Sequence, residues 1–73
     1  MSRQSCLFDR AAQCNRLIEL ETDVVRKTEL GLLRQMWIAL ANESPSMTEQ
    51  ELAREIVVIE QLQSAFCRSE QAH

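Results

Sequence analysis

The sequence predicts an all-α fold, a small three-helix domain, and three observations support this. Strong helix formers, chiefly Leu, Ala, Glu, Gln and Arg, dominate the composition. One glycine, Gly31, and one proline, Pro45, are too few for the tight turns of a small β-protein. Apolar residues also recur at helical spacing in three separate stretches. The alternative architecture is a long helical hairpin, in which the first two stretches form one continuous helix.

The length of 73 residues predicts a single domain, residues 1–73, with a small core. Chains of this size commonly gain stability by associating with another chain. We therefore expect the protein to dimerise as a helical bundle.

The first helix is predicted at about residues 5–21. Its apolar side chains cover an arc of roughly 120° at 100° per residue, which indicates one buried face. They are Leu7, Ala11, Cys14, Leu17 and Ile18. The polar run Glu21-Thr22-Asp23 then predicts a break, because Thr22 or Asp23 is suited to cap a new helix.

The second helix is predicted at about residues 23–41, with an apolar arc of roughly 200°. A single neighbour cannot cover so wide an arc, so this helix is expected to be the central element. Trp37 shares a face with several leucines and is predicted at the centre of the core, with a partner-binding surface as the competing interpretation. Gly31 either permits close helix approach or is tolerated at a cost of about 1 kcal/mol relative to Ala.

The third helix is predicted at about residues 48–68, followed by a frayed tail at 69–73. Pro45 ends the preceding helix. Thr48 and Glu51 have the spacing of a capping box, and Met47 and Leu52 have that of a hydrophobic staple. One predicted face carries the apolar residues Leu52, Ile56, Ile59, Leu62 and Phe66.

Charge and hydropathy narrow the range of partners. The net charge of −3 and the scattered Lys and Arg residues argue against nucleic acid and against an anionic membrane surface. No stretch has the length of a membrane span, and Asp9 and Arg10 interrupt the region where a signal peptide would be apolar. A cytoplasmic location is expected.

No catalytic site, metal site or cofactor site is predicted. His73, the one histidine, is the last residue, and no nucleophile has a positioned base. Cys6, Cys14 and Cys67 lack the spacing of a metal site, and Cys14 is predicted to be a small core residue. The alternative function is a thiol-based redox or soft-metal sensor that uses Cys14 and Cys67.

Surplus apolar residues indicate an interface instead. Ile38 projects onto an otherwise polar face of the second helix, and Val57 and Val58 flank the stripe of the third. With Trp37 as the further candidate, these residues form the predicted interface. The predicted function is therefore a non-enzymatic protein–protein interaction module, namely an adaptor, regulator or chaperone-like protein. A homodimer and an unidentified protein are its expected partners.

Two short motifs add a resemblance. Residues 10–17 read R-A-x-x-C-x-R-L, Asp23 follows as an acidic cap, and residues 37–41 read W-x-x-L-A. This pattern resembles that of short uncharacterised helical proteins of α-proteobacteria, over about the first 41 residues. Val24 stands where a proline often follows the Asp in that group. The resemblance implies a small helical bacterial protein and supplies no activity.

Overall fold

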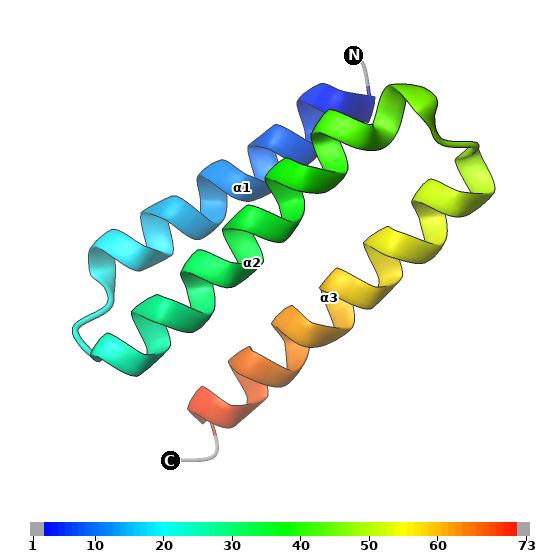
Figure 1. The fold of residues 1–73 in the computed structure, drawn as a ribbon. Helices are drawn as coiled ribbons and strands as arrows, with labels where there is room; N and C mark the ends of the chain where they lie inside the picture. The colour runs from blue at the N-terminus through cyan, green and yellow to red at the C-terminus, as the bar shows by residue number, and fades with distance from the viewer. Residues whose placement is uncertain (1–2, 72–73) are drawn as a thin grey trace.

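A computed structural model describes residues 3–71, with side chains for residues 4–66. It contains three α-helices joined by short turns: α1 (Arg3–Leu20), α2 (Val24–Glu43) and α3 (Glu49–Gln71), with a 3-10 turn η1 (Ser44–Ser46) before α3. The helices run alternately up and down, and α2 lies between the other two in the chain path (Figure 1). The prediction of a small all-α, three-helix domain is confirmed, and the long hairpin with a continuous first helix is wrong.

The turn between α1 and α2 is built from the predicted polar run. Asp23 is the N-cap, and its carboxylate accepts hydrogen bonds from the backbone N–H groups of Val25 at 2.8 Å and Arg26 at 3.4 Å. Glu21 Oε1 accepts from the N–H groups of Thr22 and Asp23, each at 3.1 Å. These bonds satisfy donors that the helix starts leave open, so the chain reverses here instead of continuing as one helix.

The second turn carries the predicted capping box. The backbone N–H of Thr48 donates to Glu51 Oε1 at 2.9 Å, and the N–H of Glu51 donates to Thr48 Oγ1 at 3.1 Å. The backbone hydrogen bond from Thr48, followed by the side-chain one, holds the pKa of Glu51 below its usual value. Leu52 belongs to the buried core and Met47 packs against that core, at the two positions of a hydrophobic staple.

Three helix ends differ from the predicted ones by two or more residues, and α1 begins at Arg3 instead of about residue 5. The helix predicted to stop at Ala41 continues to Glu43 and passes into η1, because Pro45 takes an early position of that turn, where no N–H is needed. Ser44 Oγ donates to the carbonyl of Ala41 at 2.9 Å and is buried with it. In α3, residues 69–71 of the predicted tail are helical, and residues 72–73 lie outside the described residues.

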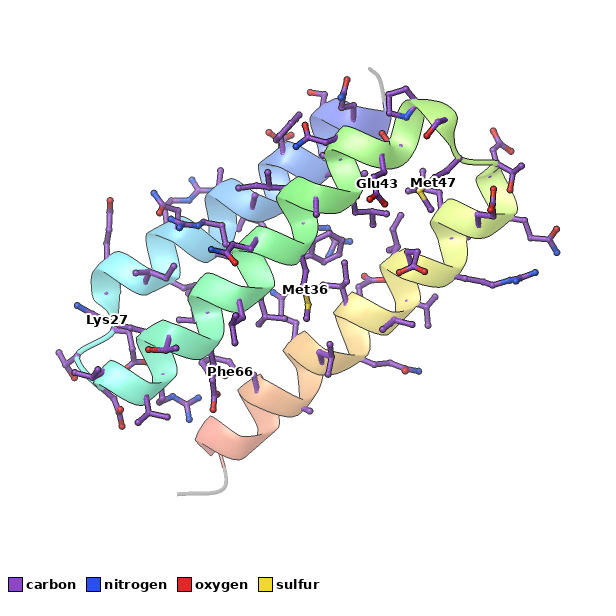
Figure 2. The ribbon with its side chains drawn as sticks, in the orientation of Figure 1. Lys27, Met36, Glu43, Met47 and Phe66 are labelled. Carbon is purple, nitrogen blue, oxygen red and sulfur yellow. The ribbon has the colours of Figure 1, made fainter. Side chains whose placement is uncertain are left out.

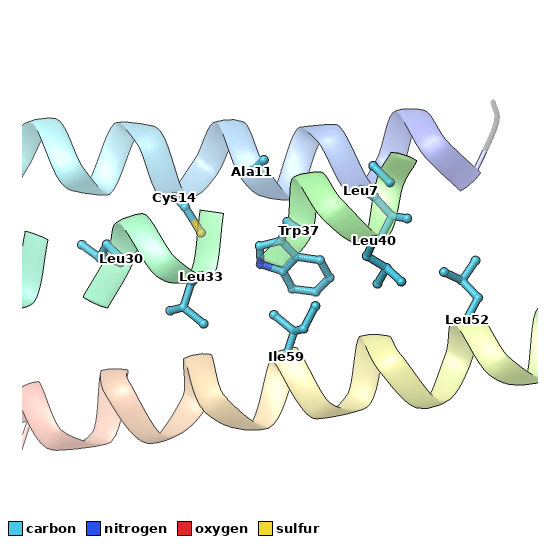
Figure 3. Close-up of a cluster of buried hydrophobic side chains, with 10 residues drawn as sticks. Leu7, Ala11, Cys14, Leu30, Leu33, Trp37, Leu40, Leu52 and Ile59 are labelled. Carbon is cyan, nitrogen blue, oxygen red and sulfur yellow. The ribbon is translucent and has the colours of Figure 1, made fainter. Parts of the chain in front are cut away.

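The core lies where the three helices face one another. Trp37 of α2 is at its middle, with Ile59 of α3 on one side and Ala11 and Cys14 of α1 on the other (Figure 3). Leu7, Leu30, Leu33, Leu40, Ala41 and Leu52 complete the buried apolar set. α1 lies closer to α2 than α3 lies to α2. The prediction that the second helix is central is confirmed.

The late turns of α3 are tied to the start of α2. Arg26 Nη2 donates to the carbonyl of Phe66 at 3.2 Å, and the guanidinium carbon lies 4.2 Å from the centre of the Phe66 ring. Arg26 Nε lies 3.6 Å from Glu21 Oε2, and both side chains are mostly buried. This cluster joins the turn between α1 and α2 to Phe66 of α3, which lies 40 positions after Arg26 in the chain.

Candidate interaction surface

Trp37, one of the predicted interface residues, is a core residue. Its relative exposure is 0 %, and its indole Nε1 donates to Gln63 Oε1 at 3.3 Å. The guanidinium carbon of Arg10 lies 5.1 Å from the centre of the ring, while Arg10 Nη2 is 3.1 Å from Glu60 Oε2. The core prediction is confirmed, and the competing assignment to a surface of this chain is wrong because polar groups of α1 and α3 close over the ring.

Ile38 was predicted on a polar, outward face and instead packs partly against the core. The reason is the position of α1. Arg34, one turn earlier on the same face of α2, donates from Nη1 to Asn15 Oδ1 of α1 at 2.9 Å. This flank of α2 is therefore covered by α1, and Ile38 contributes to helix packing within the chain.

Val57 and Val58 are about equally exposed, at 50 % and 51 %. They nevertheless point in different directions, because adjacent helix residues are separated by 100°. Val58 lines a hollow between α2 and α3, together with Met36, Ala39 and Leu62. Val57 is not part of that lining, so the structure separates two residues that the sequence grouped.

The hollow beside Val58 is one section of a longer groove. A section of about 250 Å³ lies towards η1, and one of about 360 Å³ lies towards the late turns of α3. Both sections share Met36 and Leu62, so they run into each other, and Met36 lies between α2 and α3 in Figure 2. We define the α2–α3 groove by its exposed apolar residues: Leu32, Met36 and Ala39 on α2, and Val58, Leu62 and Ala65 on α3.

Leu62 was predicted on the apolar face of the third helix, and Leu32 and Met36 belong to the wide apolar arc of the second, yet each of the three is about half exposed. The signal that pointed to the groove was the wide apolar arc of the second helix. The two flanking helices cover only part of that arc, because α3 stands away from α2 on this side. These half-exposed apolar side chains lie together along one groove, which makes it the candidate binding surface.

Among the residues that the structure describes, the charged ones lining the groove are acidic. Glu29 lines the section near Phe66, and Glu43 and Glu55 line the section near η1. Arg26 lies against Phe66, but its charge faces Glu21. The α2–α3 groove thus combines an apolar floor with carboxylates towards both ends.

Of the two predicted redox residues, Cys14 is fully buried between α1 and α2, and the Cys67 side chain lies outside the described residues. Cys14 packs as a small apolar side chain, which matches the core role predicted for it. An oxidant would reach its thiol through separation of α1 from α2. Cys6 is exposed on α1.

Among the residues that the structure describes, no group of three or more His, Cys, Asp or Glu side chains is placed to hold a metal ion. Within that same part of the chain, no helix combines the length and the hydropathy needed to cross a bilayer. Comparison with protein-family models, curated proteins and solved structures gave no match. The resemblance to α-proteobacterial proteins stays a prediction.

Proposed function

We propose that this protein is a non-enzymatic protein interaction module that binds a helix of another polypeptide in the α2–α3 groove, as an adaptor, regulator or chaperone-like protein. The observation that carries the proposal is the half-exposed apolar lining contributed by Leu32, Met36 and Leu62. Burying such a lining is favourable by about 25 cal/mol per Å² of apolar area removed from water.

The shape of the groove favours a helix as the bound element. Two antiparallel helices present facing apolar stripes, spaced at three and four residues on each helix: Leu32, Met36 and Ala39 against Val58, Leu62 and Ala65. An amphipathic helix that inserts its apolar face between such stripes completes a four-helix arrangement. A flat or extended partner would leave the floor of the groove in contact with water.

The polar side chains nearest the core have a structural role. Arg10, Glu60 and Gln63 are engaged with one another or with Trp37. Their hydrogen bonds hold α1 and α3 over the indole ring. Self-association through the second and third helices, expected from the sequence, stays a prediction.

Site-specific photocrosslinking in the organism that makes the protein tests the proposal. A photoreactive benzoylphenylalanine is placed at Val58 in one variant and at Val57 in the other. These positions are matched in helix and in exposure, and only Val58 lines the groove. We expect protein adducts from position 58 in clear excess over position 57. Equal adducts from both positions would contradict a binding role for the groove.

A further inference from the structure

We propose that the occupant of the α2–α3 groove is a basic amphipathic helix of a different protein, and not a second copy of this chain. This inference rests on the proposed function and adds the chemistry of the partner. The observation behind it is the sign of the charge at the groove: its described lining includes Glu29, Glu43 and Glu55 and no Lys or Arg.

The three carboxylates lie where the flanking residues of a bound helix would be. Glu29 and Glu43 are 14 residues apart on α2, which places them roughly 21 Å apart along the helix axis. Glu55 lies across the groove from Glu43, since both line the same section. A helix of about four turns would therefore lay its apolar face on Met36 and Leu62 and bring its two ends close to carboxylates.

In the contacts that the structure describes, no Lys or Arg side chain forms an ion pair with Glu29, Glu43 or Glu55. Arg26 is held by Glu21 and by the Phe66 ring and carbonyl. Arg10 pairs with Glu60, on the side of α3 that faces α1. Glu29, Glu43 and Glu55 are exposed side chains. Lysine or arginine residues beside the apolar stripe of a partner would complement them.

A second copy fits the same surface less well. In a two-fold dimer the same patch of each subunit meets the other. Pairing groove with groove would bring Glu29, Glu43 and Glu55 of each subunit into one interface, where like charges oppose binding. The chain as a whole is also acidic, with a net charge of −3. The apolar stripe alone would serve either partner, and the carboxylates favour the basic one.

The test uses two designed helical probe peptides of about 18 residues with the same leucine stripe. One carries Lys and the other Glu at the positions flanking the stripe, and a third peptide has the Lys composition with a scrambled order. Binding of each labelled probe to the full chain is measured by fluorescence anisotropy at low salt. Three exposed attractive pairs in the Lys complex, against three like-charge contacts in the Glu complex, predict that the Lys probe binds about tenfold or more tightly than the Glu probe. The scrambled peptide should bind far more weakly than the Lys probe.

Two sets of variants identify which surface of the protein binds the probe and which residues give the charge preference. Val58→Gln removes apolar lining from the groove and should weaken binding of the Lys probe about fivefold, whereas Val57→Gln should leave it within about twofold. The triple variant Glu29→Gln, Glu43→Gln, Glu55→Gln should remove most of the preference for the Lys probe. All of the substituted residues are exposed, so the variants are expected to fold.

The outcomes separate the two proposals. If both probes bind alike and both depend on Val58, the groove binds helices but the basic-partner inference is overturned. If Val57→Gln and Val58→Gln weaken binding equally, the groove itself is not the binding surface. Light scattering at tens of micromolar is run in parallel. A mass of about twice 8.4 kDa that falls to the monomer value in Val58→Gln would identify a second copy as the occupant.

Discussion

On the flank of α2 that faces α1, side chains are covered and tied down, while the flank that faces α3 keeps an apolar stripe open to solvent. Leu30 and Leu32 show the contrast at two positions of one helix, with relative exposures of 2 % and 55 %. Both leucines belong to the apolar arc that the sequence assigns to α2. The width of an apolar arc indicates how much surface a helix has to cover. The neighbouring helices of the same chain decide how much of that surface is left for a partner.

The largest expected effect comes from removing the residue that both flanks share. Trp37→Ala should lower the free energy of unfolding by about 3–5 kcal/mol, comparable with the stability of so short a domain. The variant should be largely unfolded by circular dichroism, and Trp37 in the native protein should emit at short wavelength and resist quenching by iodide. Trp37→Phe keeps a ring in the core and should lose less. A freely quenched indole with an unchanged melting temperature in Trp37→Ala would refute the core assignment.

The contrast between the flanks can be measured directly with two leucines. Leu30→Ala should cost about 2–5 kcal/mol because it leaves a cavity against α1, whereas Leu32→Ala should cost about 0.5 kcal/mol or less. Urea unfolding monitored by circular dichroism gives both values. Similar losses for the two variants would mean that the α3 flank of α2 is covered in solution, as a dimer through the groove would cause.

The capping box in the turn before α3 is expected to stabilise the start of that helix. Thr48→Ala removes the hydroxyl that accepts from the N–H of Glu51 and should cost about 0.5–2 kcal/mol. Thr48→Ser keeps the acceptor and should be nearly silent in thermal melts. If the Ala and Ser variants melt at the same temperature, the capping box does not contribute to the attachment of α3.

Gly31 lies on the α1 side of α2, so a substitution there tests how closely α1 packs against α2. A Cβ atom added there would meet nothing within 4 Å, so close helix approach does not require this glycine. Gly31→Ala should therefore stabilise the protein by about 0.5–1 kcal/mol through helix propensity. Ala39→Gly, on the exposed side of the same helix, should have the opposite effect of similar size. A loss of stability in Gly31→Ala would show closer packing of α1 than the structure has.

The smallest effect is the pH dependence of the α3 cap. Hydrogen bonds from Thr48 favour the ionised Glu51 and lower its pKa in the folded protein. The stabilisation is present above the pKa of the unfolded chain and is lost as pH falls through the lowered folded pKa. The difference in melting temperature between the native protein and Glu51→Gln should therefore shrink on acidification from neutral pH. A difference that is constant across this range would contradict the pKa shift.

Local signals in the sequence predicted the elements that depend on neighbouring residues. The cap at Asp23 and the capping box of Thr48 and Glu51 form through residues two or three positions apart, and the central place of Trp37 followed from the stripe around it. Ile38 was misplaced because helical periodicity gives the direction of a side chain and not the position of the next helix. The acidic ends of the groove were not predicted for the same reason, since Glu43 and Glu55 meet only when α3 lies along α2.

The contact of Arg26 with Phe66 has a consequence for the order of folding. The α1–α2 hairpin closes through residues 21–23 and its two helices pack closely, whereas the Arg26–Phe66 contact joins residues 40 positions apart at the far end of the more loosely packed pair of α2 and α3. We expect the hairpin to assemble first, with α3 docking afterwards and Arg26 fastening its late turns. The walls of the α2–α3 groove come from both of these steps, so the groove takes shape only when the last helix has docked.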